Sequence, residues 1–220
     1  NLGKGRTLPT QNLVDAFPMK DGMFAGQGSK YTLNQSNPYE NRDPRLDYTI
    51  LHHGSSWLNN TLDISIGGVN NPSNSAEYSK TGYYMCKFMG KFGEESQYGN
   101  KIHLWVMFRY AEMLLNYAEA VYERDDKISN TDLNISLNLV RLRVNPAMTP
   151  LTNELITQNA GMDMRTEIRR ERTIELFNEG FRLDDLKRWK TAETEMPMDI
   201  VGIQWKGTEY ENCLLYTSPS

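Results

Sequence analysis

The sequence predicts a mainly helical α+β protein, in which helix hairpins follow a loop-rich region of short strands. Two differences in composition carry this prediction. Residues 1–100 hold most of the Gly, Asn, Ser and Pro of the chain, which is typical of loops with short elements. From Lys101 onward, apolar residues recur at the three- and four-residue spacing of an amphipathic helix. We therefore expect a loop-rich region over 1–100, a helical region over 101–192 and an irregular tail over 193–220.

Four short elements are expected within the loop-rich region. Thr10 precedes "QNLVDAF" and predicts a short capped helix there. A turn is expected at 21–22, where Asp is followed by Gly. Residues 46–50 alternate between apolar and polar and predict a short strand, and "TGYYMCKFM" at 81–89 predicts another.

The helical region begins with a stretch that predicts a helix of about 20 residues, because it contains neither Pro nor Gly. This stretch is "LWVMFRYAEMLLNYAEAVYE", with apolar residues stepping by four and three at Leu104, Phe108, Ala111, Leu115, Ala118 and Val121. A second helix is expected from near Asp132 to a point before Pro146. Ala111, Ala118 and Ala120 allow a neighbour to pack closely, so the pair is similar to a hairpin of a tetratricopeptide-like array.

Two further helices are expected at the C-terminal end of the helical region. The first covers about 164–178 and stops at Gly180, a residue suited to the end of a helix. The second is shorter and covers about 183–190.

Composition excludes several classes of protein. The net charge of −4 argues against a nucleic-acid groove, which would need a basic stripe. The sequence has no run of about 18 apolar residues that could span a membrane. Its two cysteines, Cys86 and Cys213, form no metal or redox motif. We expect the chain to be a fragment, and the last residues, from Cys213 on, to be non-native read-through.

Basic and acidic residues crowd the stretch "EIRRERTIELFNEGFRLDDLKRWK" at 167–190. Glu171, Glu175 and Glu179 follow one another at four-residue spacing and share one face of a helix, where like charges repel. Basic side chains must therefore lie nearby. The candidates are Arg109, Arg172 and Arg182.

This charge cluster has two interpretations. In the first it is the carboxylate pair of a glycoside hydrolase, with Glu171 and either Glu175 or Glu179 flanking the scissile bond. In the second it is a lattice of ion pairs that ties helices together. We favour the lattice, because catalytic carboxylates need unlike environments and these three all lie among arginines.

Other catalytic and metal-binding motifs are absent from the sequence. His52 and His53 are adjacent, so on a strand they point to opposite faces and cannot share a metal, and His103 is isolated. The sequence also lacks a phosphate-binding loop, a Gly-x-Ser-x-Gly elbow and a Cys/His nucleophile pair. We therefore predict no enzyme activity, no metal and no cofactor.

Aromatic residues in the polar loops are the remaining candidates for a binding site. Exposed rings flanked by amides suit a sugar, whose C–H face packs on an aromatic plane while its hydroxyls bond to the amides. The alternative is that each ring anchors its loop to the core. The aromatic residues concerned are Tyr31, Trp57, Tyr78 and Tyr98. The strongest candidates for ligand binding are Trp57, Tyr78, Asn59 and Asn60.

Six segments, in order along the chain, resemble the SusD/RagB family of Bacteroidetes outer-membrane nutrient-binding lipoproteins. They are "PTQNLVDAFPMKDG" at 9–22, "NPYENRDPRLDYTIL" at 37–51, "TGYYMCKF" at 81–88, "FRYAEMLLNYAEA" at 108–120, "LNLVRLRV" at 137–144 and "IRRERTIELFNEGFRLDDLKRW" at 168–189. Three features depart from the family pattern: Asn178, Asp184-Asp185 and the helix end "LRVNPAM". These departures concern local packing.

The resemblance implies a function without catalysis. Such proteins capture glycans or other nutrients at the cell surface and act as a lid on a SusC-type TonB-dependent transporter of the outer membrane. It also implies that this chain is a C-terminal half, with the lipid-bearing Cys upstream, and that the charge cluster is a fold signature. No binding residue is carried over from the family motifs. A glycoside hydrolase, and a scaffold that contacts the transporter without binding sugar, remain the alternatives.

Overall fold

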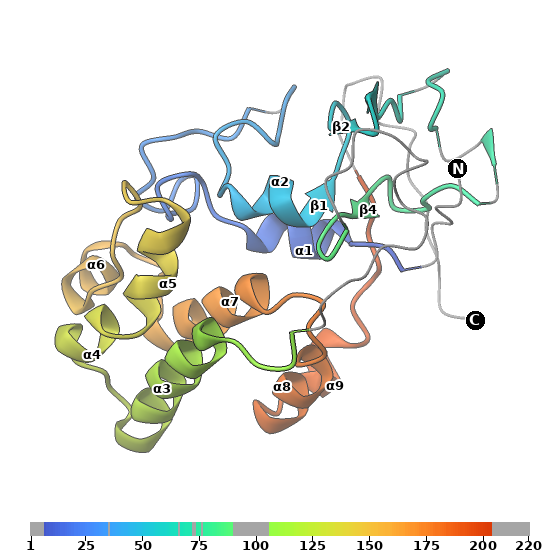
Figure 1. The fold of residues 1–220 in the computed structure, drawn as a ribbon. Coiled ribbons are helices and arrows are strands. Elements are labelled where there is room, and N and C mark those ends of the chain that lie inside the picture. The colour runs from blue at the N-terminus through green and yellow to red at the C-terminus, as the bar shows by residue number, and fades with distance from the viewer. Residues whose placement is uncertain are drawn as a thin grey trace. The chain divides into compact units, whose positions relative to one another are not determined.

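The computed structural model describes residues 7–34, 36–65, 67–71, 74–75, 77–89 and 106–203 (Figure 1). The chain forms two compact units, each assembled from distant segments. The loop-rich unit comprises Asn1–Asp15, Leu46–Trp105 and Glu193–Ser220, and the helical unit comprises Ala16–Arg45 and Val106–Ala192. The region boundaries at 100 and 192 expected from the sequence remain predictions.

Helices of the helical unit enclose an apolar core. α3 (Tyr110–Asp125) packs against α7 (Met164–Glu175) and α5 (Leu137–Val144), and α4 (Asn130–Asn134) packs against α3 and α5 (Figure 1). α6 (Asn153–Gln158) and α8 (Arg182–Arg188) follow, and α9 (Ala192–Glu195) begins at the unit's last residue. The fully buried side chains of this core include Leu115, Ala118, Leu133, Leu137, Leu151 and Ile168.

The helix of about 20 residues predicted at the start of the helical region is shorter in the structure, where it is α3. Leu104 lies outside the described residues, and residues 106–109 are not helical. Arg109 has extended backbone, with φ −142° and ψ 156°, so α3 begins one residue later. At the other end, Asp126 adopts a left-handed φ of 51°, which ends the helix after Asp125.

The second predicted helix is two helices, α4 and α5. α4 begins at Asn130, where the Ser129 side chain accepts a hydrogen bond from the backbone N–H of Asp132. The break falls at Ser136, whose hydroxyl donates to the backbone oxygen of Asp132 at 2.5 Å. Such a local side-chain bond competes with the helical ladder, which explains why one periodic pattern gives two elements.

α6 was not predicted from the sequence, although Thr152 caps it by accepting a hydrogen bond from the backbone N–H of Leu155. α7 ends at Glu175 and not near residue 178. Asn178 already has a left-handed φ of 59°, so the chain has left the helix before Gly180. The last predicted helix is α8, displaced by one or two residues from the expected range.

Among its described residues, the loop-rich unit contains two small antiparallel sheets. β1 (Ile50–Leu51) pairs with β4 (Tyr84–Met85), placing Ile50 opposite Met85. β2 (Ser56–Trp57) pairs with β3 (Asn60–Thr61). In the segment predicted as a strand at 81–89, the described pairing is limited to β4. α1 (Gln11–Ala16) is the short helix predicted there, with the hydroxyl of Thr10 accepting from the backbone N–H of Leu13 at 3.3 Å.

The strand predicted over residues 46–50 is wrong. Residues Arg45–Thr49 form a helix, α2, and only Ile50 belongs to β1. Asp43 accepts the backbone N–H of Arg45 at 2.9 Å and Pro44 follows it, which is a helix start that the alternation of residues 46–50 obscured. Leu46 and Ile50 are both buried while Tyr48 is 62% exposed. Burial therefore follows the four-residue spacing of a helix and not the two-residue alternation of a strand.

The turn predicted at residues 21–22 is present in the helical unit. The backbone N–H of Gly22 donates to the oxygen of Met19 at 2.8 Å, and Gly22 has a φ of 80°. A Cβ at this position would lie 2.2 Å from a guanidinium nitrogen of Arg141 and 2.5 Å from Cγ of Met148. Both the backbone conformation and the close approach therefore require glycine here.

Candidate functional site

Three of the four predicted binding residues lie on one β-hairpin of the loop-rich unit. Trp57 on β2 is paired with Asn60 on β3. The two connecting residues, Leu58 and Asn59, have φ values of 50° and 60°, as a type I′ turn requires. This tight turn brings the indole and both amide side chains to the tip of one hairpin.

Exposure differs between these side chains. Trp57 is half-buried, whereas Asn59 and Asn60 are exposed. The side-chain N–H of Asn60 donates to the backbone oxygen of Leu58 at 2.8 Å and so stiffens the turn. A ring held partly against the protein beside exposed amides is able to stack on a sugar face and bond to its hydroxyls.

Tyr78 lies elsewhere in the loop-rich unit. Its backbone N–H donates to the oxygen of Ser75 at 3.1 Å, and no hydrogen bond among the described residues joins it to the hairpin. Tyr78 instead lies near Tyr84, because the hydroxyl of Tyr84 accepts the backbone N–H of the next residue, Ser79, at 3.0 Å. Burial, together with the nearby Tyr78, raises the pKa of Tyr84.

The other loop aromatics fall outside this hairpin. Tyr31 belongs to the helical unit, where the Lys30 ammonium lies 5.3 Å from its ring centroid. Tyr98 lies outside the described residues, as do His103 and Cys213.

The two adjacent histidines have separate structural partners. The Nε2 of His52 lies 2.8 Å from the carboxylate of Asp47, and its Nδ1 lies 2.8 Å from the backbone oxygen of His53. His53 accepts the backbone N–H of Ile64 at 3.3 Å. Within the described ranges, no group of three or more His, Cys, Asp and Glu side chains is arranged to hold a metal ion.

The charge cluster of the helical unit centres on Glu175. Its carboxylate contacts three guanidinium groups: Arg45 at 3.1 Å, Arg109 at 2.6 Å and Arg143 at 2.8 Å. Arg45 also bonds to Glu171 at 2.5 Å, and Arg109 bonds to Glu179 at 2.7 Å. Two arginines thus bridge the three glutamates and remove the repulsion expected along this face.

Only one of the three arginines expected to neutralise these glutamates does so by a described contact. Arg109 was expected and is present, whereas Arg172 instead bonds to Asp185 at 2.8 Å and Asn116 at 2.6 Å. Arg182 donates to the hydroxyl of Thr173 at 3.0 Å. The partners that the sequence did not reveal are Arg45 and Arg143.

A carboxylate among three arginines stays ionised. Burial raises the pKa of Glu175, but the positive charges of Arg45, Arg109 and Arg143 outweigh it and lower the pKa to about 2. A general acid must instead hold its proton near neutral pH, which requires a raised pKa. The environment of Glu175 is therefore that of a structural anion.

A second ion-pair network joins α3 to α8. Glu119 on α3 accepts from Arg188 at 2.6 Å and from the indole N–H of Trp189 at 2.5 Å. Arg188 also bonds to Asp185 at 2.8 Å, the same carboxylate that holds Arg172. Glu119, Arg172 and Asp185 are buried, so this network links helices in the interior.

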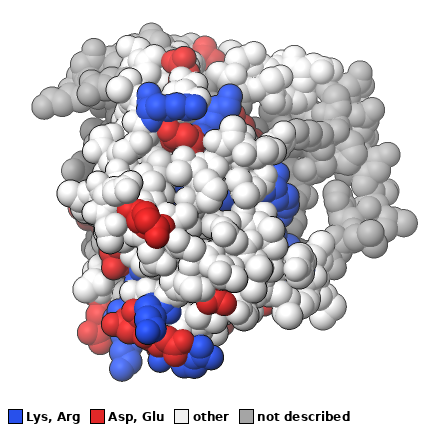
Figure 2. All heavy atoms as spheres, turned by 90° about the vertical axis from the view of Figure 1, so that its left-hand side faces the viewer, with Lys and Arg blue, Asp and Glu red and all other residues white. Residues whose placement is uncertain are grey.

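Exposed ion pairs form a third group at the C-terminal end of α3. Arg165 contacts Glu123 at 3.2 Å and Asp126 at 2.8 Å, while Arg124 contacts Asp125 at 2.6 Å. Figure 2 views the molecule from the left-hand side of Figure 1. Acidic and basic side chains lie side by side along the lower edge of the face that it shows, below a largely uncharged surface. Signs are mixed, so this edge is not a basic patch for a polyanion.

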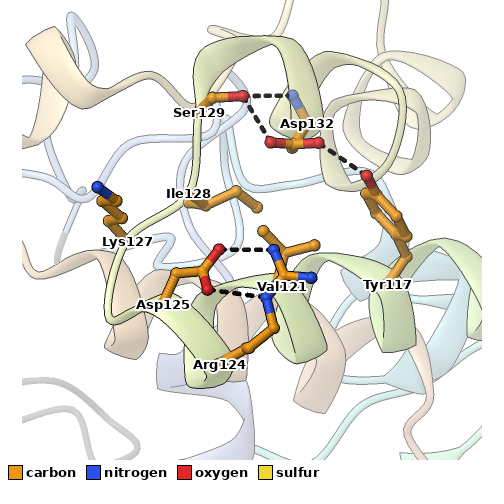
Figure 3. A pocket seen from close by; sticks show the side chains of 8 residues that line it. All are labelled: Tyr117, Val121, Arg124, Asp125, Lys127, Ile128, Ser129 and Asp132. Atoms are coloured by element: carbon orange, nitrogen blue, oxygen red, sulfur yellow. Dashed lines mark hydrogen bonds and ion pairs between the residues drawn. The ribbon is translucent and has the colours of Figure 1, made fainter.

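A cavity of about 300 Å³ lies between α3 and the start of α4 (Figure 3). Val121 and Ile128 supply apolar lining, while Arg124, Asp125 and Lys127 are charged. The hydroxyl of Tyr117 donates to Asp132 at 2.7 Å across the cavity, and Ser129 donates to the same carboxylate at 2.6 Å. Most polar groups here are thus already paired with one another.

The family of the chain follows from comparison with known proteins. The model of the SusD family matches residues 1–211, and the chain belongs to this family. The resemblance inferred from six segments is thereby confirmed. A comparison with curated protein sequences gives no match.

Two solved structures extend this result to the fold. A SusD-like carbohydrate-binding protein from Bacteroides fragilis is 27% identical with a TM-score of 0.70, covering 92% of this chain. A second SusD-like protein from Bacteroides fragilis is 32% identical with a TM-score of 0.64, covering 84% of this chain. The mainly helical fold class is confirmed. The chain spans only 39% and 36% of the lengths of these two proteins.

Among the helices described, none is both long and apolar enough to cross a bilayer.

Proposed function

We propose that this chain is part of a cell-surface protein that captures a glycan for import and does not cleave it. The observation that carries the proposal is the match to the SusD family over residues 1–211, together with the likeness to a SusD-like carbohydrate-binding protein. The hairpin tip of Trp57, Asn59 and Asn60 supplies a ring and two amides suited to a sugar. Tyr78 is a weaker candidate, because it is not part of that hairpin and no described hydrogen bond joins it to the tip.

Absence of catalysis is supported by the charge cluster. A glycoside hydrolase built on Glu171 with Glu175 or Glu179 would need one carboxyl that keeps its proton. The low pKa of Glu175, and the arginines that bridge it to its neighbours, work against that role. The proposal therefore assigns no cofactor, no metal and no nucleic acid to this chain.

The proposed partner is a SusC-type TonB-dependent transporter of the outer membrane, and the proposed location is the cell surface, with a lipid anchor upstream of this chain. Both rest on family membership. Copurification with such a transporter, without binding to any glycan, would favour the scaffold alternative.

Trp57→Ala in the full-length protein tests the glycan site. Affinity is measured by gel electrophoresis against a panel of soluble polysaccharides, and thermal stability in parallel. Loss of a stacking ring is expected to weaken binding by roughly tenfold or more, at an unchanged melting temperature. Tyr48→Ala is the control, because Tyr48 is an exposed aromatic side chain of the loop-rich unit that lies outside the hairpin.

Two outcomes contradict this assignment. A large fall in melting temperature would mean that Trp57 anchors its loop to the core. Unaltered affinity would place the glycan site in another part of the protein. Asn59→Ala and Asn60→Ala then separate the contribution of the amides from that of the ring.

A further inference from the structure

The cavity of Figure 3 belongs to the helical unit and shares no residue with the hairpin of Trp57. Its apolar lining comes from Val121 on α3 and from Ile128, which is 3% exposed. The ring of Tyr117, one helical turn before Val121, stands at one side of the cavity (Figure 3). These side chains offer an apolar floor and an aromatic wall to a ligand with a C–H face.

Polar groups on one side of the cavity are already held in place. The hydroxyls of Tyr117 and Ser129 donate to opposite oxygens of the Asp132 carboxylate, at 2.7 and 2.6 Å. Ser129 also accepts the backbone N–H of Asp132 at 3.1 Å. Each carboxylate oxygen keeps a second lone pair, so Asp132 is able to accept a hydroxyl from a ligand without being reoriented.

The donors of the cavity are two exposed cations. Arg124 holds Asp125 with its Nε and one terminal nitrogen, which leaves the N–H groups of the other terminal nitrogen for a ligand. The ammonium of Lys127 forms no hydrogen bond or ion pair with another residue of the described part of the chain. Donors and acceptors therefore both surround the apolar floor.

Charge and size restrict the class of ligand. The positive charges of Arg124 and Lys127 are matched by the negative charges of Asp125 and Asp132, so the lining favours a neutral ligand over an ion. A volume of about 300 Å³ lies at the lower end of the range for ligand sites, which suits a single ring. A sugar ring is neutral, has a C–H face and carries hydroxyls that both donate and accept.

We propose that this cavity is a second carbohydrate-binding subsite, which holds one pyranose ring of a neutral glycan. The C–H face of the ring packs on Val121 and Ile128, one hydroxyl donates to Asp132 and another accepts from Lys127. The inference rests on the proposed function, because it assigns the same class of ligand to a second place on the chain. A single ring makes few contacts, so its expected Kd is about 1 mM or weaker.

Methyl NMR tests the subsite in the full-length protein with labelled isoleucine δ1 methyl groups. The signal of Ile128 is assigned with Ile128→Val. The probes are the methyl glycosides of glucose, galactose and mannose, each titrated through the millimolar range. The Ile128 signal is expected to shift and to saturate with at least one of these probes.

Two variants remove the proposed partners of the sugar hydroxyls. Lys127→Ala and Asp132→Asn are each expected to weaken the binding reported by Ile128 at least about fivefold. Lys127→Ala is expected to do so at an unchanged melting temperature, because its ammonium holds no other described residue. Lys187→Ala is the matched control, because Lys187 is an exposed lysine of α8 that does not line the cavity, and it is expected to leave the affinity unchanged.

An Ile128 signal that stays still with all three probes would overturn the inference. A shift that grows without saturating, or that both variants leave unchanged, would overturn it as well. The indole N–H signal of Trp57, recorded with the polysaccharide panel, separates this failure from that of the proposed function. Movement of the indole with a still Ile128 methyl would remove the subsite and keep the hairpin site, whereas an indole that stays still with every polysaccharide would contradict the hairpin site itself.

Discussion

Buried polar groups are satisfied differently in the two units of the molecule. In the helical unit several of them are charged side chains bonded to one another across helices, as in Arg45 with Glu171 and Arg172 with Asp185. In the loop-rich unit, neutral side chains bond to the backbone instead. Ser79 donates to the oxygen of Tyr83 at 2.5 Å, and Thr81 donates to the oxygen of Pro9 at 2.7 Å.

The physical reason for this difference is the backbone. A helix satisfies its own N–H and C=O groups, so polar side chains remain available to join one helix to another. The described strands of the loop-rich unit are two residues long and pair few backbone groups. Its Asn, Ser and Thr side chains must supply the missing partners. The amide of Asn71, for example, donates to the oxygens of Ile64 and Ser65 at 3.1 and 2.7 Å.

The largest expected effect comes from breaking the charge cluster of the helical unit. Glu175→Gln leaves the guanidinium groups of Arg45 and Arg109 without their shared counter-charge in a buried site. We expect a loss of about 3 kcal/mol in the free energy of unfolding, measured by chemical denaturation. We also expect the wild-type protein to release no reducing sugar from the polysaccharides that it binds.

Glu123→Gln is the matched control for this experiment. Glu123 accepts from Arg165 and Arg169, but it is exposed, and its loss is expected to cost less than about 1 kcal/mol. Similar losses for both variants would mean that burial does not distinguish the two groups of ion pairs. Glycan cleavage by the wild type that Glu175→Gln abolishes would restore the hydrolase interpretation.

Acid should weaken the same cluster. The pKa of Glu175 is about 2 in the folded protein and near 4.5 in an unfolded chain, so the unfolded state binds its proton first as the pH falls. Its contribution to stability is complete above about pH 5 and is lost progressively towards pH 2, amounting to about 3 kcal/mol. Denaturation curves at several pH values should show the gap between wild type and Glu175→Gln closing over this window. A constant gap would contradict the depressed pKa.

The smallest expected effect concerns the hairpin of the loop-rich unit. Leu58 has a φ of 50°, a conformation that Asn adopts at lower cost than Leu. Leu58→Asn is therefore expected to stabilise the protein by about 0.5 kcal/mol, seen as a small rise in melting temperature. If stability falls instead, contacts of the half-buried Leu58 side chain outweigh the strain of its backbone.

Much of the helical unit could be predicted from the sequence, because helix signals are local. The periodicity of apolar residues located α3, a helix was expected where α7 lies, and the four-residue spacing of Glu171, Glu175 and Glu179 placed all three on one face. The pattern failed where local side-chain bonds compete with the helix. Ser136 divides the second helix, and Asp43 with Pro44 begins a helix where alternation predicted a strand.

Other features of the molecule were decided by tertiary structure alone. Arg45 lies 126 residues before Glu171 in the sequence, and no local pattern joins them. The pairing of Trp57 with Asn60 depends on a turn in which Leu58 adopts a conformation that its residue type disfavours. The sequence by itself determined the family, the helical character of the second region and the need for cations beside the glutamates. Packing between distant segments decided which arginines neutralise the glutamates and which apolar side chains of α3 stay exposed. The reason is that burial is a property of the folded chain.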